Sequence, residues 1–345
     1  MDVADEIRLK QLEKEAEHWA REIRREKSRD SGDISSRTSW LDHPLILQHY
    51  KTRCKIEGMD WHLWAYDYLK DRANEILDLG CGTGTRTLLF LELGFKRAIG
   101  YDLSSERISE ARDLASKRNF IAKFEVADVN SLRLEHNRFD LIISCHSFHH
   151  FQKLERIMAA VSRALKPSGL FILEEFVGPS LFQWSDEQLT ITNNLLALLP
   201  EKYRIYQTGT TKLVHGRDTP EAVRAVSPFE AVRSSEIVPL FYKNFEVLHH
   251  SHLGGTIQHL LYAGIIHNFK DGDPDAERII NNVDNLESFL IARKTIPSDF
   301  DLIVGRKISD NQRTLSTARK CLDGIRAKVA QFKKRMAFAS VWTAI

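Results

Sequence analysis

The sequence of 345 residues predicts an α/β fold, in which a mostly parallel sheet of seven strands carries helices on both faces. Short apolar runs alternate with segments of helical spacing along residues 72–176, as is typical of parallel strands joined by helices. The first run ends in a glycine-rich turn, and the next runs end in polar residues. Because the carboxyl ends of parallel strands meet at one edge of the sheet, we expect a ligand site there.

The first strand and its turn lie within residues 75–90, EILDLGCGTGTRTLLF. Ile76, Leu77 and Leu79 predict a strand that is buried on both faces. An acid and three glycines then precede a predicted helix over residues 85–93, namely Asp78, Gly80, Gly82 and Gly84. This order allows ligand atoms to approach backbone N–H groups closely.

Four further apolar runs predict the next strands, at residues 98–102, 124–129, 139–144 and 170–174. Asp102 ends the first of them, and Ser104 is placed to cap a helix that runs through residue 117. Asp128 lies at the end of the second. A helix is expected over residues 154–165, before the last of these strands.

The G-x-G-x-G spacing after an acid, with further acids at the next two strand ends, resembles the class I S-adenosylmethionine-dependent methyltransferases. The resemblance covers residues 72–176 and implies a Rossmann-like sheet with S-adenosylmethionine as cofactor. It implies that the glycine loop lies under the amino-acid part, that Asp102 accepts the ribose hydroxyls and that Asp128 meets the adenine amino group. The cofactor-binding residues that it implies are Asp78, Gly80, Cys81, Gly82, Thr83, Gly84, Asp102, Leu103, Asp128, Val129, Cys145 and His146.

The run 145–150, CHSFHH, follows the fourth strand, where this family presents residues that face the acceptor. A hydroxyl acceptor must lose its proton, and histidine suits that role near neutral pH. Our hypothesis is that His149 or His150 is the general base; alternatively, both cap the strand and bond to the backbone. Glu175, or Glu174 beside it, is a second candidate for the base or for a residue that orients the acceptor. The alternative is that this carboxylate only pairs with an arginine or lies at a helix N-terminus.

The acceptor is predicted to be a hydroxyl of a small molecule or a glycan. The run lacks the Asn/Asp-Pro-Pro-Tyr/Phe motif of amino-methylating members. Residues 40–44 and 176–184 resemble a group of bacterial methyltransferases of largely unassigned acceptor, some of which occur in settings that suggest surface-glycan or secondary-metabolite tailoring. A non-catalytic cofactor-binding protein and a protein or RNA methyltransferase are the alternatives. Residues that could line an acceptor pocket are His215, Arg217, Arg233, His249, His250 and His252. The histidine spacings His146-x-x-His149 and His249-His250-x-His252 match no strong zinc signature, so no metal is expected.

Composition favours a soluble, cytoplasmic protein that does not bind nucleic acid. Lys and Arg (49) nearly balance Asp and Glu (47), which argues against a dedicated nucleic-acid surface. The four cysteines form no C-x-x-C pair and are expected to be reduced thiols. No apolar run reaches the roughly 18 residues of a membrane span.

Three parts are predicted: an N-terminal helical extension and lid (1–71), a methyltransferase domain (72–308) and a C-terminal amphipathic helix (309–345). Acceptor-side insertions are expected at about 177–220 and 256–299, with strands at 245–251 and 300–305. Further helices are expected over residues 2–29, 40–50, 60–70, 181–199, 220–241 and 257–294. The first of them carries a narrow apolar seam, in which Leu9, Ala16 and Ile23 repeat every seven residues, as do Leu12 and Trp19.

Two sets of helices leave alternatives open. The aromatic residues Trp40, Tyr50, Trp61 and Trp64 either contact the ligand or, as we favour, pack the lid on the sheet. The C-terminal helix combines apolar heptad rows with a basic face. It could pair with the N-terminal helix, form a homodimer seam or lie on an anionic membrane, and helix pairing is favoured.

Overall fold

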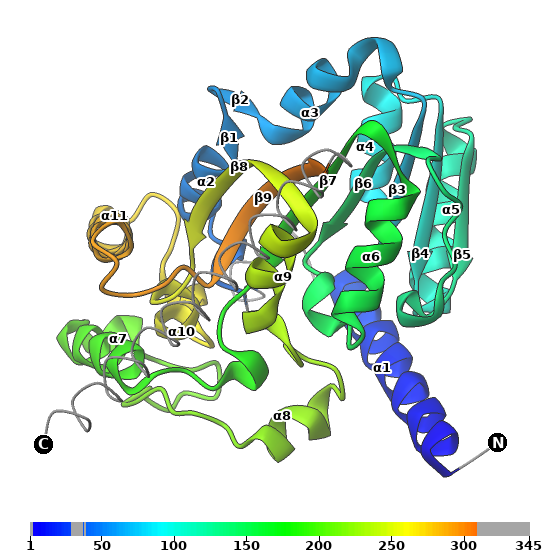
Figure 1. The fold of residues 1–345 in the computed structure, drawn as a ribbon. Coiled ribbons are helices and arrows are strands. Elements are labelled where there is room, and N and C mark those ends of the chain that lie inside the picture. Colours follow the sequence, from blue (N-terminus) through cyan, green and yellow to red (C-terminus); the bar gives the residue numbers. More distant parts are fainter. Residues whose placement is uncertain (1–2, 29–36, 38, 309–345) are drawn as a thin grey trace, which may run out of the picture. The chain divides into compact units, whose positions relative to one another are not determined.

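The computed structural model describes residues 3–28, 37 and 39–308 (Figure 1). Residues Met1–Arg306 form one compact unit, and a second unit begins at Lys307. The predicted helix over 309–345 lies outside the described residues, so its proposed pairings stay predictions. Among the residues described, no helix combines the length and the apolar character that crossing a membrane requires.

The core is a seven-stranded sheet with the order β5-β4-β3-β6-β7-β9-β8. Its strands are β3 (Glu75–Leu79), β4 (Arg97–Asp102), β5 (Ala122–Val126), β6 (Phe139–Cys145), β7 (Leu165–Phe176), β8 (Phe245–Gly254) and β9 (Phe300–Lys307). The pairs from β5 to β7 are parallel, and β9 runs antiparallel to β7. This confirms the predicted mostly parallel sheet. The strand order reverses between β3 and β6, and a crevice for a ligand is expected at such a point.

The helices are α1 (Val3–Ser28), α2 (Pro44–Arg53), α3 (Trp61–Leu69), α4 (Thr85–Leu93), α5 (Ser105–Lys117), α6 (Leu154–Ala164), α7 (Asp186–Leu198), α8 (Pro220–Val226), α9 (Ile237–Asn244), α10 (Gln258–Tyr262) and α11 (Pro274–Ala292). A two-stranded hairpin, β1 (Lys55–Ile56) and β2 (Met59–Asp60), precedes α3. Short 3-10 turns include η4 (Val129–Ser131), η5 (Phe148–His150) and η6 (Ser180–Phe182).

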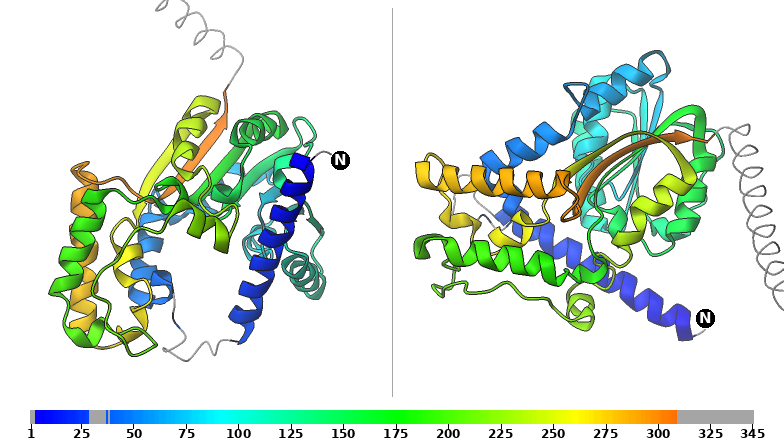
Figure 2. Two further views of the ribbon diagram at one scale, coloured as in Figure 1. Left: turned by 90° about the horizontal axis from the view of Figure 1, so that it is seen from below. Right: turned by 60° about the vertical axis from the view of Figure 1, so that its left-hand side comes forward.

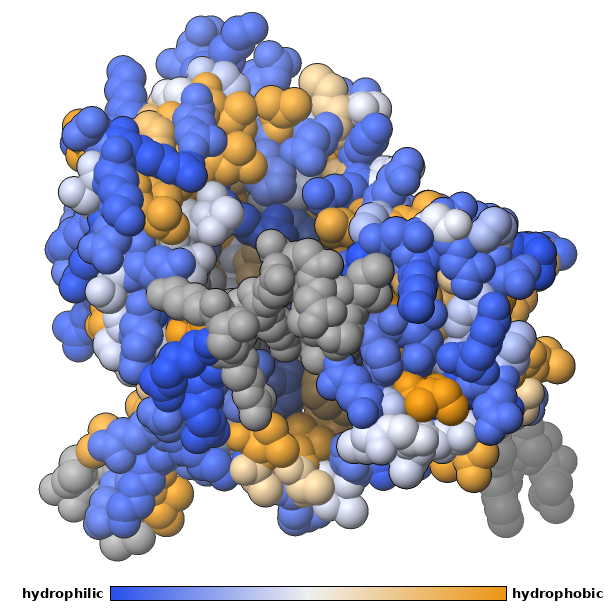
Figure 3. Space-filling view, turned by 180° about the vertical axis from the view of Figure 1, so that it is seen from behind, coloured by the Kyte–Doolittle hydropathy of each residue, from blue (hydrophilic) through white to orange (hydrophobic). Residues whose placement is uncertain are grey.

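The sheet separates two hydrophobic layers, because alternate side chains of each strand point to opposite faces. Ile76 and Leu141 pack in one layer with α3, α4 and α5. Leu77 and Ile142 pack in the other layer with α6 and α9. Figures 1 and 2 show these helices flanking the strands, while α7, α10 and α11 gather apart from them. In Figure 3 one face of the molecule is mostly hydrophilic, with hydrophobic residues in small separate groups.

Two predicted strand boundaries were wrong. The strand expected over 124–129 ends at Val126, because the Asp128 carboxylate accepts from the backbone N–H of Asn130 and caps η4. The strand expected at 170–174 begins already at Leu165, which pairs with Phe139 before a register shift.

The helix expected over 220–241 is broken, and this break positions part of the site. α8 ends at Val226 and α9 begins at Ile237. Between them the backbone N–H of Val232 donates to the His149 carbonyl, and the Ser227 hydroxyl donates to Glu15. These contacts, made far along the chain, hold residues 227–233 against η5 and α1.

The two predicted insertions are also helical only in part. Residues 181–199 form η6 and then α7, and residues 257–294 form α10, a 3-10 turn and α11. Lys212 ties the two insertions together: its side chain is 1% exposed, and its amine donates to the carbonyls of Leu260, Leu261 and Ala263. Burial lowers the pKa of Lys212 to about 8.

Candidate active site

A cavity of about 400 Å³ opens where β3, β4, β5 and β6 end. Its position agrees with the crevice expected where the strand order reverses. The predicted cofactor residues that line it are Asp78, Gly80, Cys81, Gly82, Thr83, Asp102, Leu103, Asp128, Val129, Cys145 and His146. α1 forms another part of the wall through Leu12, Glu15 and Trp19.

The glycines of the turn after β3 have different roles. Gly80 has φ of 77°, and a Cβ there would lie 2.4 Å from the Ser147 side chain. Only glycine therefore lets the turn pass this close to the loop after β6. Gly84 also has positive φ, but its Cβ would lie 2.8 Å from the Phe124 ring. It lies outside the cavity wall, so we assign Gly84 to packing between α4 and β5 rather than to ligand contact.

Two acids of the predicted set are held by neighbouring donors. Asp78 is buried and accepts from the Thr87 hydroxyl at 2.5 Å. Burial raises the pKa of Asp78 to about 7, although the Thr87 hydrogen bond lowers it in part. Asp102 accepts from the backbone N–H groups of Gly82 and Ser104, both at 2.9 Å. These bonds fix the Asp102 carboxylate at the cavity edge.

The third acid, Asp128, is already engaged by several donors. It accepts from Asn130 through both backbone and side chain, from Ser131, and from Arg8 of α1 at 2.6 Å. Burial alone would raise the pKa of Asp128, but these hydrogen bonds lower it overall. An adenine amino group that reached Asp128 would therefore share the carboxylate with Arg8.

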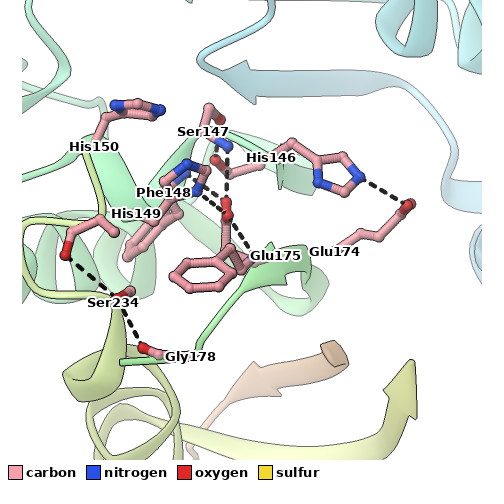
Figure 4. A network of polar contacts seen from close by, with 12 residues as sticks. His146, Ser147, Phe148, His149, His150, Glu174, Glu175, Gly178 and Ser234 are labelled. Atoms are coloured by element: carbon pink, nitrogen blue, oxygen red, sulfur yellow. Dashed lines mark hydrogen bonds and ion pairs between the residues drawn. The ribbon is translucent and has the colours of Figure 1, made fainter. Parts of the chain in front are cut away.

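Glu174 is the centre of a charged group, and Figure 4 shows its contact with His146. Arg86 binds both of its oxygens at 2.6 and 3.1 Å, Trp61 donates at 3.0 Å, and His146 lies at 3.2 Å. Burial would raise the pKa of Glu174, but Arg86 and His146 lower it strongly. Glu174 is thus the Arg-paired carboxylate that was the alternative to a base. His146 has φ of 51°, a left-handed conformation that is uncommon outside glycine.

Glu175 is fully buried and organises the turn that carries the histidines (Figure 4). It accepts from the backbone N–H groups of Ser147, Phe148 and Phe176 at 2.6–2.8 Å, and it pairs with Nδ1 of His149. Glu175 does not line the cavity. Its position therefore favours a role in holding the turn over the predicted role of base.

The two histidines of this turn differ in their access to the cavity. His149 does not line the cavity. Burial would lower the pKa of His149, but the carboxylates of Glu175 and Glu230 raise this pKa to about 10. His149 therefore holds its proton at neutral pH. His150 lines the cavity and packs edge-to-face on Trp19, with ring centroids 5.1 Å apart. Its Nδ1 lies 3.1 Å from Glu15, and its Nε2 lies 3.9 Å from Glu230. His150 is therefore the better placed of the two to meet a ligand.

The residues expected around an acceptor pocket are dispersed. His215 and Arg217 line a second cavity of about 350 Å³, with Trp184 and His259 from the two insertions. The other four lie elsewhere: Arg233 binds Glu155 and Glu236, His249 contacts Ser251, and His250 and His252 contact Asp301.

Several cavity residues were missed by sequence reasoning, among them Glu15 and Arg86, and so was Glu230 behind His150. The apolar seam of the first helix was a signal for Leu12 and Trp19, whereas no local pattern marks Glu230. Among the aromatic residues, Trp40, Tyr50, Trp61 and Trp64 are buried in the core, as we favoured, and none lines the cavity.

Known proteins resemble the central part of this chain. The pattern of a family described as methyltransferase domain matches residues 77–173. An uncharacterized protein of Haemophilus influenzae is 30% identical over 108 residues, which are 30% of this chain and 42% of that protein. A demethylmenaquinone methyltransferase of Bacteroides fragilis is 30% identical over 148 residues, or 41% of this chain and 56% of that enzyme. The chain thus spans about half the length of these curated relatives.

Among solved structures, an S-adenosylmethionine-dependent methyltransferase from Mesorhizobium loti aligns with 67% of this chain and 90% of its own, at 18% identity and a TM-score of 0.40. The matched family covers β3 to β7 of the sheet. Residues 77–173 therefore match a methyltransferase domain, and S-adenosylmethionine is the cofactor that the resemblance of the sequence implies for it.

Proposed function

We propose that this chain transfers the methyl group of S-adenosylmethionine to a hydroxyl of a small molecule or a glycan. The observation that supports a hydroxyl acceptor is the position of His150, in the cavity wall with Glu15 and Glu230 facing its two ring nitrogens. A hydroxyl must lose its proton during transfer, and a placed proton acceptor contributes roughly 10²–10⁴-fold in rate. In this proposal the polar cluster around His150 supplies that function.

Transfer from a sulfonium needs mainly positioning, because the leaving group is already activated by its charge. Orientation of two reactants contributes about 7–11 kcal/mol to lowering the barrier. We propose that the turn at Gly80 holds the amino-acid part of the cofactor and that Asp102 holds its ribose. This proposal is supported by the positions of Gly80 and Asp102, which both line the same cavity.

The acceptor side is proposed to lie toward the two insertions, which together line the second cavity. The Phe176 ring contacts both the His149 ring, at 5.8 Å, and the Trp184 ring of that cavity, at 6.0 Å. Relatives include enzymes named sterol 24-C-methyltransferase and phosphoethanolamine N-methyltransferase. Those names give carbon and nitrogen as the methylated atoms. The proposal of an oxygen acceptor therefore rests on this chain's own residues.

The test is incubation of the protein with methyl-labelled S-adenosylmethionine and a panel of sugars, glycan fragments, phenols, RNA and protein extract. The expected product carries the label on oxygen, as NMR identifies, and the single-turnover rate of His150→Ala falls about 10²–10⁴-fold with cofactor affinity retained. His252→Ala, on β8, is the matched control. Label on nitrogen, carbon, RNA or protein contradicts the proposal, and cofactor binding without product across the panel favours a non-catalytic protein.

We also propose that the reaction takes place in the cytoplasm. The support is that Cys54, Cys81 and Cys145 are free thiols, as is usual in reducing compartments.

A further inference from the structure

Five ionisable side chains converge beside the cofactor cavity from four separate segments. His149 and His150 belong to η5, Glu15 to α1, Glu175 to β7, and Glu230 to the turn between α8 and α9. The ligand atoms of His149, His150 and Glu230 all lie within 4.8 Å of one another. We call these three residues the histidine–glutamate cluster.

Both histidines of the cluster are oriented in the same way. Nδ1 of each ring faces a buried carboxylate, Glu175 for His149 and Glu15 for His150. Nε2 of each ring faces Glu230, at 3.5 Å from His149 and 3.9 Å from His150. Each imidazole is thus backed by one carboxylate and points its other nitrogen at a shared third one.

These Nε2 contacts are too long for hydrogen bonds, which span about 2.7–3.2 Å from nitrogen to oxygen. His150 is 8% exposed, and its Nε2 has no hydrogen-bond partner. A buried polar group without a partner costs about 1–3 kcal/mol. A partner from outside the protein, placed between the Nε2 atoms and Glu230, would remove this cost.

A second group of two histidines and one carboxylate differs from this cluster in its distances. His250 and His252 lie 2.7 and 2.9 Å from Asp301, within ordinary hydrogen-bond distance, so their contacts are complete without an ion. In the histidine–glutamate cluster the contacts of 3.5 and 3.9 Å with Glu230 are longer than hydrogen bonds, and the shorter one equals the spacing of ligand atoms around one ion. Atoms bound at 2.0–2.2 Å in a tetrahedral site lie roughly 3.3–3.6 Å apart.

We propose that His149, His150 and Glu230 bind one divalent first-row transition-metal ion, of which Zn²⁺ is the representative, and that the ion displaces the proton that His149 otherwise holds. Two imidazoles and one carboxylate suit such an ion and leave a coordination position open, whereas Mg²⁺ and Ca²⁺ prefer oxygen ligands alone. Glu175 and Glu15 are positioning residues, since a carboxylate on the second ring nitrogen of a ligating histidine fixes its tautomer and orientation.

The site lies at the cavity wall, because His150 and Glu15 are part of that wall. The ion would lower the pKa of an acceptor hydroxyl bound at the open position, so that this hydroxyl would release its proton to solvent without an imidazole base. This consequence rests on the proposed function, whereas metal binding itself does not.

The experiment uses the full chain without a histidine tag, stripped with a chelator and titrated with Zn²⁺ by calorimetry and with Co²⁺ by visible absorption. One equivalent is expected to bind, with a Co²⁺ spectrum of nitrogen and oxygen ligands. His150→Ala and Glu230→Gln are expected to weaken binding at least 100-fold, and Glu15→Gln about 10–100-fold. His252→Ala, from the contrasting group, should bind as the unchanged protein does.

The proposal is overturned if neither ion binds at millimolar concentration, or if His150→Ala and Glu230→Gln bind as tightly as the unchanged protein. It is also overturned if His252→Ala loses binding equally. Circular dichroism checks that each variant is folded, and the Glu230→Gln substitution keeps the side-chain volume. Calorimetry with S-adenosylhomocysteine, run on the same metal-free samples, separates a failed metal site from a failed cofactor site.

Discussion

Asp78 links the charge state of the cavity to pH. It is the last residue but one of β3, is buried and lines the cofactor cavity, and burial raises its pKa to about 7. Its carboxyl is therefore largely protonated below pH 7 and largely charged above it. The cofactor carries a sulfonium and an amino group, both positive, which favour a charged carboxylate nearby.

We predict that S-adenosylmethionine binds more tightly as the pH rises through about 7, because below that pH Asp78 must release a proton on binding. The affinity should fall by up to about tenfold for each pH unit below 7. Asp78→Asn should bind more weakly at pH 8 and should lose this slope. Calorimetry between pH 6 and pH 8 measures both effects, with Asp113→Asn on the exposed side of α5 as control. An unchanged slope in Asp78→Asn contradicts the prediction.

Single residues were predictable where a local pattern sets their position. Gly80 and Asp102 were predicted at a ligand site because each lies where an apolar strand ends, and both line the cavity. The role of Glu175 was not predictable, because it depends on backbone N–H groups of a turn on the neighbouring strand. Glu230 likewise reaches His150 only through the folded chain.

At the scale of elements, α1 is the part that covers the cofactor cavity. Leu12, Glu15 and Trp19 face the cavity, and the Arg107 guanidinium lies over the Trp19 ring at 4.7 Å. The seam predicted for this helix included Leu9, which is 45% exposed. The seam therefore packs only in part, toward α5 and the cavity.

We predict that Trp19→Ala speeds cofactor dissociation about tenfold, which corresponds to about 1.4 kcal/mol. The substitution removes the ring that closes the wall against Arg107 and His150. Stopped-flow displacement of a fluorescent cofactor analogue measures the rate. Leu9→Ala, on the exposed side of the same helix, should dissociate as the unchanged protein does. Equal rates for both variants would show that α1 does not retain the cofactor.

Elements were predicted well where apolar periodicity continued through them. α4 and α5 begin and end where the spacing and the Ser104 cap place them. The segment 220–241 also has helical spacing, but it breaks because Ser227 and Val232 bind α1 and η5 instead. Tertiary contacts of this kind override a local preference for helix.

At the scale of the molecule, the cavity joins parts that are distant in the sequence. Its wall combines α1, four strand ends of the sheet and Phe229 from the turn after α8. All of these belong to the unit Met1–Arg306. A ligand bound there should therefore stabilise the sheet and the helices that cover it as one cooperative unit.

We predict that S-adenosylhomocysteine at 100 times its Kd stabilises the protein by about 2.7 kcal/mol and raises Tm by roughly 5 °C, in a single transition. Calorimetric scans with and without the ligand test this. The control is Asp102→Ala at the same ligand concentration, for which the shift should be largely lost. Two transitions, of which the ligand moves only one, would contradict a single cooperative unit.

Lys212 gives this protein a built-in chemical reporter. Its amine is enclosed by three carbonyl groups of the second insertion, so a water-soluble acylating reagent reaches it only when that region opens. Lys202, with an exposed side chain, would be labelled at once and supplies an internal standard. The ratio of the two labelled peptides in a mass spectrum would then measure how often the helical insertions come apart, without any engineered probe.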